Sequence, residues 1–149
     1  MSAVDDALAK VDDTAFAIDM SNLVFARHEA VGFMALTEAE QTVYCLDALE
    51  REVNNGGFDQ FFFNSSGDTA METVTPLERL GANQTAGLVR RAVGVFPGGR
   101  PSADRDAREP DGGELWSQLT DAFYEYRDNL TALERAYVQA HRGEFRDAP

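Results

Sequence analysis

The chain has 149 residues, of which 44% are hydrophobic, and its formal net charge is −13 at pH 7. This length suits one domain that buries roughly two thirds of its unfolded surface, and the fifteen aromatic residues exclude a chain too polar to fold. The excess of acidic residues argues against nucleic acid or an anionic membrane as a binding partner and favours a basic protein.

The sequence also bounds the compartment and the chemistry. The first ten residues, MSAVDDALAK, lack the basic and apolar regions of a secretory signal, and no apolar run reaches the ~20 residues that cross a bilayer. We therefore expect a cytoplasmic protein.

Cys45 is the single cysteine, and its helical context favours a small buried side chain over a nucleophile. His28 lacks the second histidine, one turn further on, of a zinc protease helix. We predict no metal site, no cofactor and no catalytic residue.

The charge is distributed unevenly along the sequence. Residues 1–78 contain fifteen acidic and three basic residues, a net of −12, whereas residues 79–149 contain eleven and ten, a net of −1. This asymmetry favours an acidic surface that faces a basic partner. The alternative is an acidity that only promotes solubility, and a composition with one Lys against twelve Arg is compatible with such a general bias. Pairing of the C-terminal arginines with the N-terminal acids inside the fold would also remove the acidic surface.

Residues 3–19 are predicted to form one amphipathic helix. Its apolar stripe has helical spacing and consists of Val4, Leu8, Val11, Ala15 and Ile18. The aspartates lie on the flank away from this stripe and form a ridge about 21 Å long, at 1.5 Å rise per residue. The members of the ridge are Asp5, Asp6, Asp12, Asp13 and Asp19. The alternative is that the ridge is only a solvated helix face.

Residues 20–36 are more apolar, and a second acidic helix is predicted to follow them. Thr37 and Glu40 form a capping box, T-x-x-E, which marks its start. Its core stripe is Ala39, Val43, Leu46, Leu49 and Val53. The acids on its remaining faces extend the acidic surface, and they are Glu38, Glu40, Asp47, Glu50 and Glu52.

The string NNGGFDQFFFNSSGD, residues 54–68, interrupts this pattern. Asn and Gly at 54–57 tolerate the left-handed conformation at a helix C-terminus. Phe58, Phe61 and Phe62 have the spacing of one helix face, so we expect an aromatic wedge in the core, with Phe63 to one side. The alternative is a loop that contacts a small ligand through its polar residues. The segment's characteristic residues are Asn54, Asn55, Gly56, Gly57, Phe58, Gln60, Phe61, Phe62, Asn64, Ser65, Ser66 and Gly67.

The remaining pattern is helical. We expect helices over 69–80, with a kink or break at Pro76 and an end at Gly81, and over 84–96, 114–127 and 130–142. Residues 97–113 are rich in Pro and Gly and are predicted to form a mobile loop. No alternating strand pattern is found. We predict an all-α fold, a compact single domain over residues 1–149 with six or seven helices in an irregular bundle.

Four segments resemble a known family. EVNNGGFDQFFFNSSGD, Arg79-Leu80-Gly81-Ala82, the block at 119–124 and the block at 137–141 are similar to the bacterial DNA-mimic proteins, the neisserial DNA-mimic-like family. The resemblance covers nearly the whole chain. It implies an acidic helical protein, often dimeric, whose carboxylates imitate the phosphates of duplex DNA. Such a protein occupies the DNA-binding surface of a repressor.

Three functions follow as hypotheses. The first is a non-enzymatic DNA mimic that binds a basic DNA-binding protein, such as a transcriptional repressor, through the ten carboxylates of the two helices. B-DNA carries one charge per ~1.7 Å, and the first ridge offers about one per 4 Å, so the second helix or a two-fold homodimer must add to it. The second is an acidic interaction or immunity-type module with a client that does not bind DNA. The third is a small-ligand protein or enzyme that uses the NNGG/NSSG segment.

Overall fold

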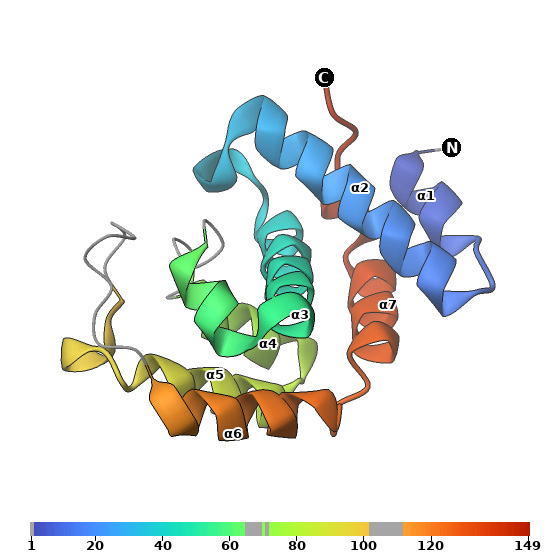
Figure 1. The fold of residues 1–149 in the computed structure, drawn as a ribbon. Coiled ribbons are helices and arrows are strands. Elements are labelled where there is room, and N and C mark those ends of the chain that lie inside the picture. Colours follow the sequence, from blue (N-terminus) through green and yellow to red (C-terminus); the bar gives the residue numbers. More distant parts are fainter. Residues whose placement is uncertain (1, 65–69, 71, 102–111) are drawn as a thin grey trace. The chain divides into compact units, whose positions relative to one another are not determined.

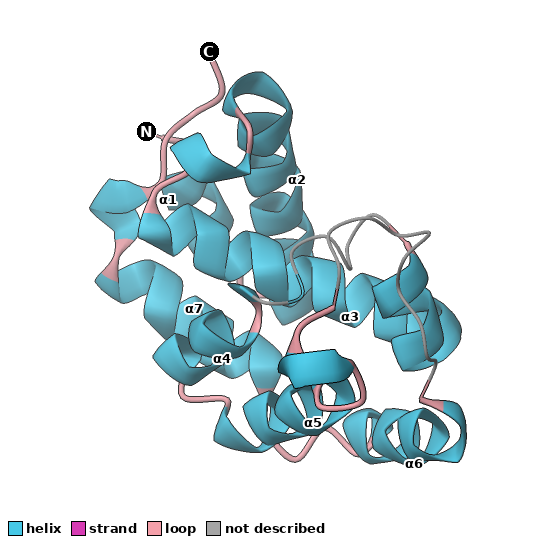
Figure 2. Cartoon of the chain, turned by 90° about the vertical axis from the view of Figure 1, so that its left-hand side faces the viewer, coloured by secondary structure: helices cyan, strands magenta, loops and turns pink. Residues whose placement is uncertain are grey.

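In the computed structural model, residues 2–64, 70, 72–101 and 112–149 are described. All regular elements among them are helical, and Figure 2 shows helices joined by loops. Seven α-helices are found in these ranges, so the all-α prediction is confirmed. Within the same ranges no helix has the length and apolarity needed to cross a membrane. The α-helices are α1 (Ala3–Leu8), α2 (Asp13–Val31), α3 (Glu38–Phe63), α4 (Val74–Leu80), α5 (Asn83–Val93), α6 (Gly113–Tyr124) and α7 (Leu130–Ala140).

The chain divides into two compact units, and Figure 1 labels the helices that belong to them. We name the two units by their positions along the chain. The outer unit contains residues 1–44 and 129–149, and the inner unit contains the continuous residues 45–128. The outer unit therefore holds α1, α2, the start of α3 and α7, while the inner unit holds the rest of α3 and α4, α5 and α6. The single domain over 1–149 stays a prediction.

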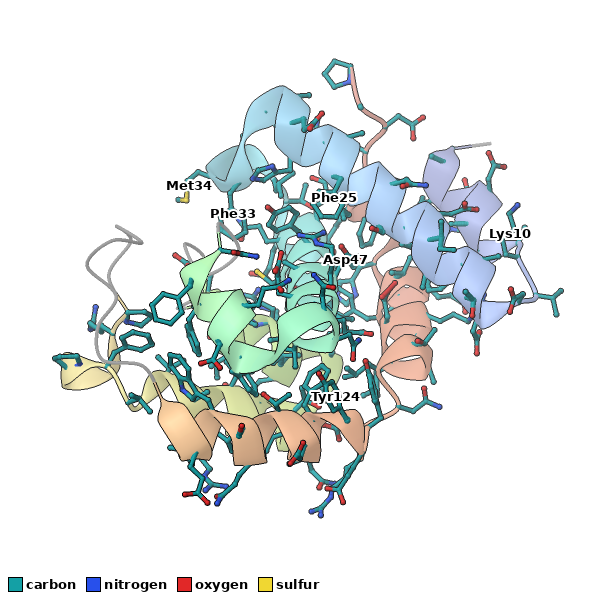
Figure 3. All side chains as sticks on the ribbon, viewed as in Figure 1. Lys10, Phe25, Phe33, Met34, Asp47 and Tyr124 are labelled. Atoms are coloured by element: carbon teal, nitrogen blue, oxygen red, sulfur yellow. The ribbon has the colours of Figure 1, made fainter. Side chains whose placement is uncertain are left out.

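The predicted helix over 3–19 is in fact two helices. α1 ends at Leu8, and α2 begins at Asp13. The Asp12 side chain accepts hydrogen bonds from the Thr14 and Ala15 N–H groups at 3.3 and 3.2 Å. This N-cap starts a new helix because it satisfies donors that have no partner within the helix. Lys10 lies in the turn between α1 and α2 (Figure 3). The continuous 21 Å ridge is therefore wrong.

The break changes which residues α2 buries. Its inward face consists of Phe16, Met20, Leu23, Val24 and Arg27. Val11 lies in the turn and is 97% exposed, and Ile18 is 55% exposed, so both leave the predicted apolar stripe. The predicted apolar stripe assumed one continuous helix from Val4 to Ile18. Because α2 begins anew at Asp13, its side chains do not continue the rotation of those of α1, and the stripe is interrupted.

The start of α3 agrees with the sequence. The Glu40 N–H donates to Thr37 Oγ1 at 3.1 Å, and the Thr37 N–H donates to Glu40 Oε1 at 2.9 Å. This reciprocal pair is the predicted capping box. The predicted core stripe of the helix is also buried, and it consists of Ala39, Val43, Leu46, Leu49 and Val53.

α3 is broken in its last third by the predicted glycines. Gly56 and Gly57 depart from helical geometry, and Gly57 has a φ of 73°. A Cβ at Gly57 would lie 3.0 Å from Thr120 Oγ1 on α6. Thr120 Oγ1 also accepts a hydrogen bond from the Phe58 N–H at 3.1 Å. Position 57 thus needs glycine both for its backbone angle and for the close approach of α6.

The aromatic wedge forms the core of the inner unit. Phe58, Phe61 and Phe62 are each at most 1% exposed, as predicted, while Phe63 is 38% exposed. The Phe62 ring stacks on Trp116 with 4.8 Å between centroids. The Trp116 indole N–H donates to the Ala92 carbonyl at 3.0 Å, which satisfies its buried polar group.

The later helices follow the predictions with three differences, of which the first is that α4 begins at Val74 and not at residue 69. α4 ends at Gly81, whose φ is 84°, as expected of a left-handed cap. Pro76 lies in the first turn of α4, where a missing N–H costs little, so it neither kinks nor divides the helix. Tyr126 lies within the predicted helix over 114–127, but it is 38% exposed and follows the end of α6 with a φ of 47°. Of the predicted mobile loop, residues 102–111 lie outside the described residues.

Candidate acidic interface

The ten predicted carboxylates divide between the two units. Asp5, Asp6, Asp12, Asp13, Asp19, Glu38 and Glu40 belong to the outer unit, and Asp47, Glu50 and Glu52 belong to the inner unit. The outer unit contains eleven acidic and five basic residues, a net of −6, and the inner unit contains fifteen and eight, a net of −7. Both units are therefore acidic, and the −12 to −1 split along the sequence does not become a split between units.

The two aspartates of α1 have different surroundings. Asp5 Oδ2 accepts from the Ser2 hydroxyl at 2.7 Å, and its other oxygen accepts from the Arg142 guanidinium. The hydrogen bond from Ser2, followed by that from Arg142, lowers the pKa of Asp5 to about 2. Its charge therefore persists at neutral pH but is engaged inside the outer unit. Asp6 is exposed and is the freer of the two carboxylates.

The three aspartates at the start of α2 and within it are also engaged in contacts of the outer unit. Asp12 caps α2. Asp13 Oδ1 lies 2.9 Å from Arg135 Nη2 and 3.1 Å from Arg135 Nε, a contact that ties α2 to α7. The same guanidinium lies 4.3 Å from the centroid of the Phe16 ring. Asp19 faces Lys10 at 3.8 Å. Pairing of N-terminal acids with C-terminal arginines, one of the alternatives raised by the sequence, thus occurs for Asp5 and Asp13.

Of the two predicted acids at the start of α3, Glu38 is exposed and Glu40 is not. Glu40 is fully buried. Its Oε2 accepts from Arg27 Nε and from the Arg146 N–H, both at 3.1 Å, in addition to the capping contact with Thr37. Glu40 was predicted to belong to the acidic surface, and that assignment is wrong because its charge neutralises a buried arginine instead.

The three predicted carboxylates that belong to the inner unit contribute little free charge. Asp47 lies 3.2 Å from Arg51 Nη1, and its position on α3 is labelled in Figure 3. Burial, and then the nearby charge of Asp47, raise the pKa of Glu50 to about 7, so Glu50 is about half protonated near neutral pH. Glu52 is buried, and its Oε2 accepts from Gln60 and Asn64 at 2.7 and 2.8 Å. The surface assignment of Glu52 is therefore wrong.

The outer unit also has an acidic hollow that the sequence did not reveal. Asp6, Asp19 and Asp147 line this hollow of about 360 Å³ together with Asn22, over a floor that includes Leu23. Asp19 and Asn22 lie three residues apart on α2, so helical spacing could have joined them. Asp147 lies more than a hundred residues away, and no sequence signal links it to α2. An apolar floor below carboxylates suits the stem and the cationic head of a lysine or arginine side chain.

The NNGG segment is a structural network. Asn54 Nδ2 donates to the Tyr126 hydroxyl at 2.7 Å, and the Tyr124 hydroxyl donates to the Val53 carbonyl at 2.8 Å. Gln60 and Asn64 hold Glu52, as described above. The contacts of Tyr124 and Tyr126 therefore tie α3 to the end of α6, whereas Gln60 and Asn64 link the two parts of α3 on either side of its break. Asn55 is exposed. The remaining predicted members, Ser65, Ser66 and Gly67, lie outside the described residues.

The described residues also limit the chemistry available. Burial raises the pKa of the Cys45 thiol to about 12, so this thiol is protonated and inert at neutral pH. Among the described residues no three His, Cys, Asp or Glu side chains are grouped so as to hold a metal ion. The acidic hollow of the outer unit is instead lined by carboxylates, which suit a cationic side chain.

Comparison with known proteins assigns the family. The model of the DMP19-like protein family matches residues 34–141, well over half of the chain. No curated protein and no solved structure matches the chain. The matched range includes the NNGG network, the aromatic wedge and α4 to α7, which are the elements that build the inner unit and part of the outer one. The chain therefore belongs to the DMP19-like family, the DNA-mimic family that its sequence resembles.

Proposed function

We propose that this protein is a non-enzymatic DNA mimic that binds a basic DNA-binding protein, such as a transcriptional repressor, and occupies its DNA-binding surface. Membership of the DMP19-like family is the observation that carries the proposal. The net charge of −13 and the carboxylate-lined hollow of the outer unit support it. Lys and Arg side chains that normally hold DNA phosphates would instead meet Asp6, Asp19 and Asp147.

The density of charge favours a second copy as part of the mimic. α2 has 19 residues and is about 28 Å long at 1.5 Å per residue. Its acids are Asp13, Asp19 and Glu29, about one per 9 Å, against one per ~1.7 Å in duplex DNA. One helix is too sparse to represent a phosphate row. We therefore propose a two-fold homodimer, which would double the acidic surface and match the symmetry of a dimeric repressor.

The proposal is tested by capture of the partner. The tagged protein is incubated with a lysate of its native host at low salt, and bound proteins are eluted with a salt gradient and identified by mass spectrometry. We expect a DNA-binding protein that excess duplex DNA releases, because both ligands compete for the same basic surface. If the captured protein does not bind DNA, or if duplex DNA fails to release it, the mimic is rejected.

Matched variants locate the surface. The double variant Asp6→Asn/Asp147→Asn removes two charges at the hollow, and Glu114→Gln/Asp121→Asn removes two exposed charges of α6 in the inner unit. We expect the first to weaken binding of the captured protein about tenfold or more and the second to change it less than about threefold. Equal effects of the two variants would mean that net charge, and not this surface, governs binding.

A second candidate function is an acidic interaction module with a client that does not bind DNA. Exposed apolar side chains in the outer unit favour it, since Val11 is 97% exposed, Met34 88% and Ile18 55% (Met34 is labelled in Figure 3). An interface that uses these side chains would survive moderate salt and would fail in Val11→Ser or Ile18→Ser. The test is made at a salt concentration at which the captured protein no longer binds duplex DNA. If the unchanged protein still binds its client there and these variants do not, the result favours this module over the mimic.

A further inference from the structure

A second surface feature, in the inner unit, has the opposite charge. A groove of about 620 Å³ runs between α5 and α6, and three arginines line it, Arg90, Arg91 and Arg127. Arginine side chains are the usual donors to phosphate, sulfonate and carboxylate groups in proteins. A cationic groove is unexpected in a protein of net charge −13, and neither the family assignment nor the proposed mimicry uses it.

The order of residues along the groove follows from contacts between the helices. Asp128, just beyond α6, accepts from the Thr85 N–H and hydroxyl at the start of α5, at 2.7 and 2.9 Å. Trp116, near the start of α6, donates to the carbonyl of Ala92 at the end of α5. The two helices are therefore antiparallel. Arg90 and Arg91 lie at one end of the groove, and Arg127 lies at the other.

The charges at the two ends differ. Arg127 pairs with Glu125 at 3.1 Å and adjoins the carboxylate of Asp128, so two carboxylates accompany one arginine at this end. Arg90 pairs with Glu78 at 3.4 Å, so one carboxylate accompanies two arginines at the other end; the side chains of both pairs are more than half exposed, and such pairs hold weakly. Among the described residues, no ion pair is found for Arg91. The end of the groove at Arg90 and Arg91 is thus the one able to take an anionic group.

The middle of the groove is apolar and open. Leu88 and Phe123 line it, and between the arginines and the start of α5 the helix has a glycine, Gly87. A Cβ at Gly87 would meet nothing within 4 Å, so open space lies above the backbone at this point. A glycine inside a helix disfavours that helix relative to alanine. Because position 87 has no side chain, the groove is open above the backbone of α5 at this point.

We propose that this groove binds an amphipathic organic anion. Its acidic group would lie at Arg90 and Arg91, and its flat apolar body would lie over Gly87 against Leu88 and Phe123, toward Asn83 and Gln84. A cationic end that continues into an apolar surface matches the acidic group and the apolar body of such a molecule, and the side-chain amides of Asn83 and Gln84 lie beyond the apolar surface. The groove lies entirely in the inner unit, so this binding is independent of the acidic hollow of the outer unit.

The probe for this proposal is anilinonaphthalene sulfonate, an anion with a flat apolar body whose fluorescence rises on binding. N-phenyl-1-naphthylamine has the same body without the charge and serves as the neutral control. We expect the anion to bind one site per chain, and the neutral analogue to bind at least about tenfold more weakly. Equal affinity for the two probes would overturn the proposal, as would no saturable binding of the anion.

Three variants test the site itself. Gly87→Leu fills the open space with a good helix former and should abolish binding while the melting temperature is kept or raised. Arg91→Gln should weaken binding roughly tenfold, whereas Arg100→Gln, an exposed arginine of the same unit outside the groove, should change it less than about twofold. If Gly87→Leu and Arg91→Gln bind the probe as the unchanged protein does, the groove is not the site. Partner capture by Gly87→Leu should stay unchanged, which separates this test from that of the mimic.

Discussion

Glu50 should make the stability of this protein fall as the pH rises toward neutrality. In the unfolded chain its carboxyl group ionises near the ordinary pKa of 4.5, whereas in the fold burial raises the pKa to about 7. Between these two pH values the folded state therefore binds more protons than the unfolded state. By linkage, the free energy of unfolding falls with pH across this window and is lowest above it.

The size of the effect follows from the shift. Each pKa unit corresponds to about 1.4 kcal/mol, so the full shift is worth about 3 kcal/mol. The side chain is only partly removed from solvent, so we expect a loss of about 1 to 3 kcal/mol between pH 4.5 and 8. Asp5 has the opposite sign, because its pKa is lowered to about 2 and its contribution is lost only as the pH falls below about 4. The two groups therefore act in different pH ranges.

Glu50→Gln isolates this contribution, since glutamine resembles the protonated acid in shape and stays neutral. Urea unfolding of both proteins between pH 4.5 and 8 should show similar stability at the acidic end and a more stable variant, by about 1 to 3 kcal/mol, at pH 8. Glu29→Gln removes one exposed acid and should give a pH-independent change within about 0.5 kcal/mol. A stability difference between Glu50→Gln and the unchanged protein that is constant over the whole range would refute the reasoning.

Four further substitutions test the fold by chemical denaturation. Gly57→Ala should cost about 2 kcal/mol or more, because its φ is 73° and Thr120 is 3.0 Å from the new Cβ, and a loss below about 0.5 kcal/mol would show that the break in α3 can relax. Glu40→Gln should cost about 3 kcal/mol, since it leaves Arg27 buried without its counter-charge, and a neutral result would contradict the buried pair. Phe62→Ala should cost about 3 to 5 kcal/mol and Phe63→Ala distinctly less, so equal losses would count against the aromatic wedge.

Local signals in the sequence predicted much of the fold. The capping box at Thr37 and Glu40, the glycine break at Gly57 and the buried phenylalanines after it each depend on residues within four positions of one another. Glu40 shows the limit of this reasoning. The sequence identified it as a cap and also counted it as a surface acid, although a carboxylate held by a cap has little freedom to face a partner.

The candidate site could be predicted less well because it depends on contacts between distant residues. Asp13 meets Arg135 across 122 positions, and Asp5 meets Arg142 across 137. The distribution of charge along the chain cannot reveal such pairs, so the acidic ridge contained carboxylates that are engaged within the outer unit. The apolar spacing from Val4 to Ile18 predicted one continuous helix, so the sequence analysis missed the break that ends at the N-cap Asp12.

The division of the chain has a consequence for how the protein is made on the ribosome. The inner unit is one continuous segment, residues 45–128, whereas the outer unit joins residues 1–44 to residues 129–149. Residues 1–44 leave the ribosome before the inner unit, whereas α7 and the arginines that hold Asp5 and Asp13 follow it. α1 and α2 therefore lack the α7 part of their unit until the whole inner unit has been synthesised, and the outer unit completes its fold after the inner unit has left the ribosome.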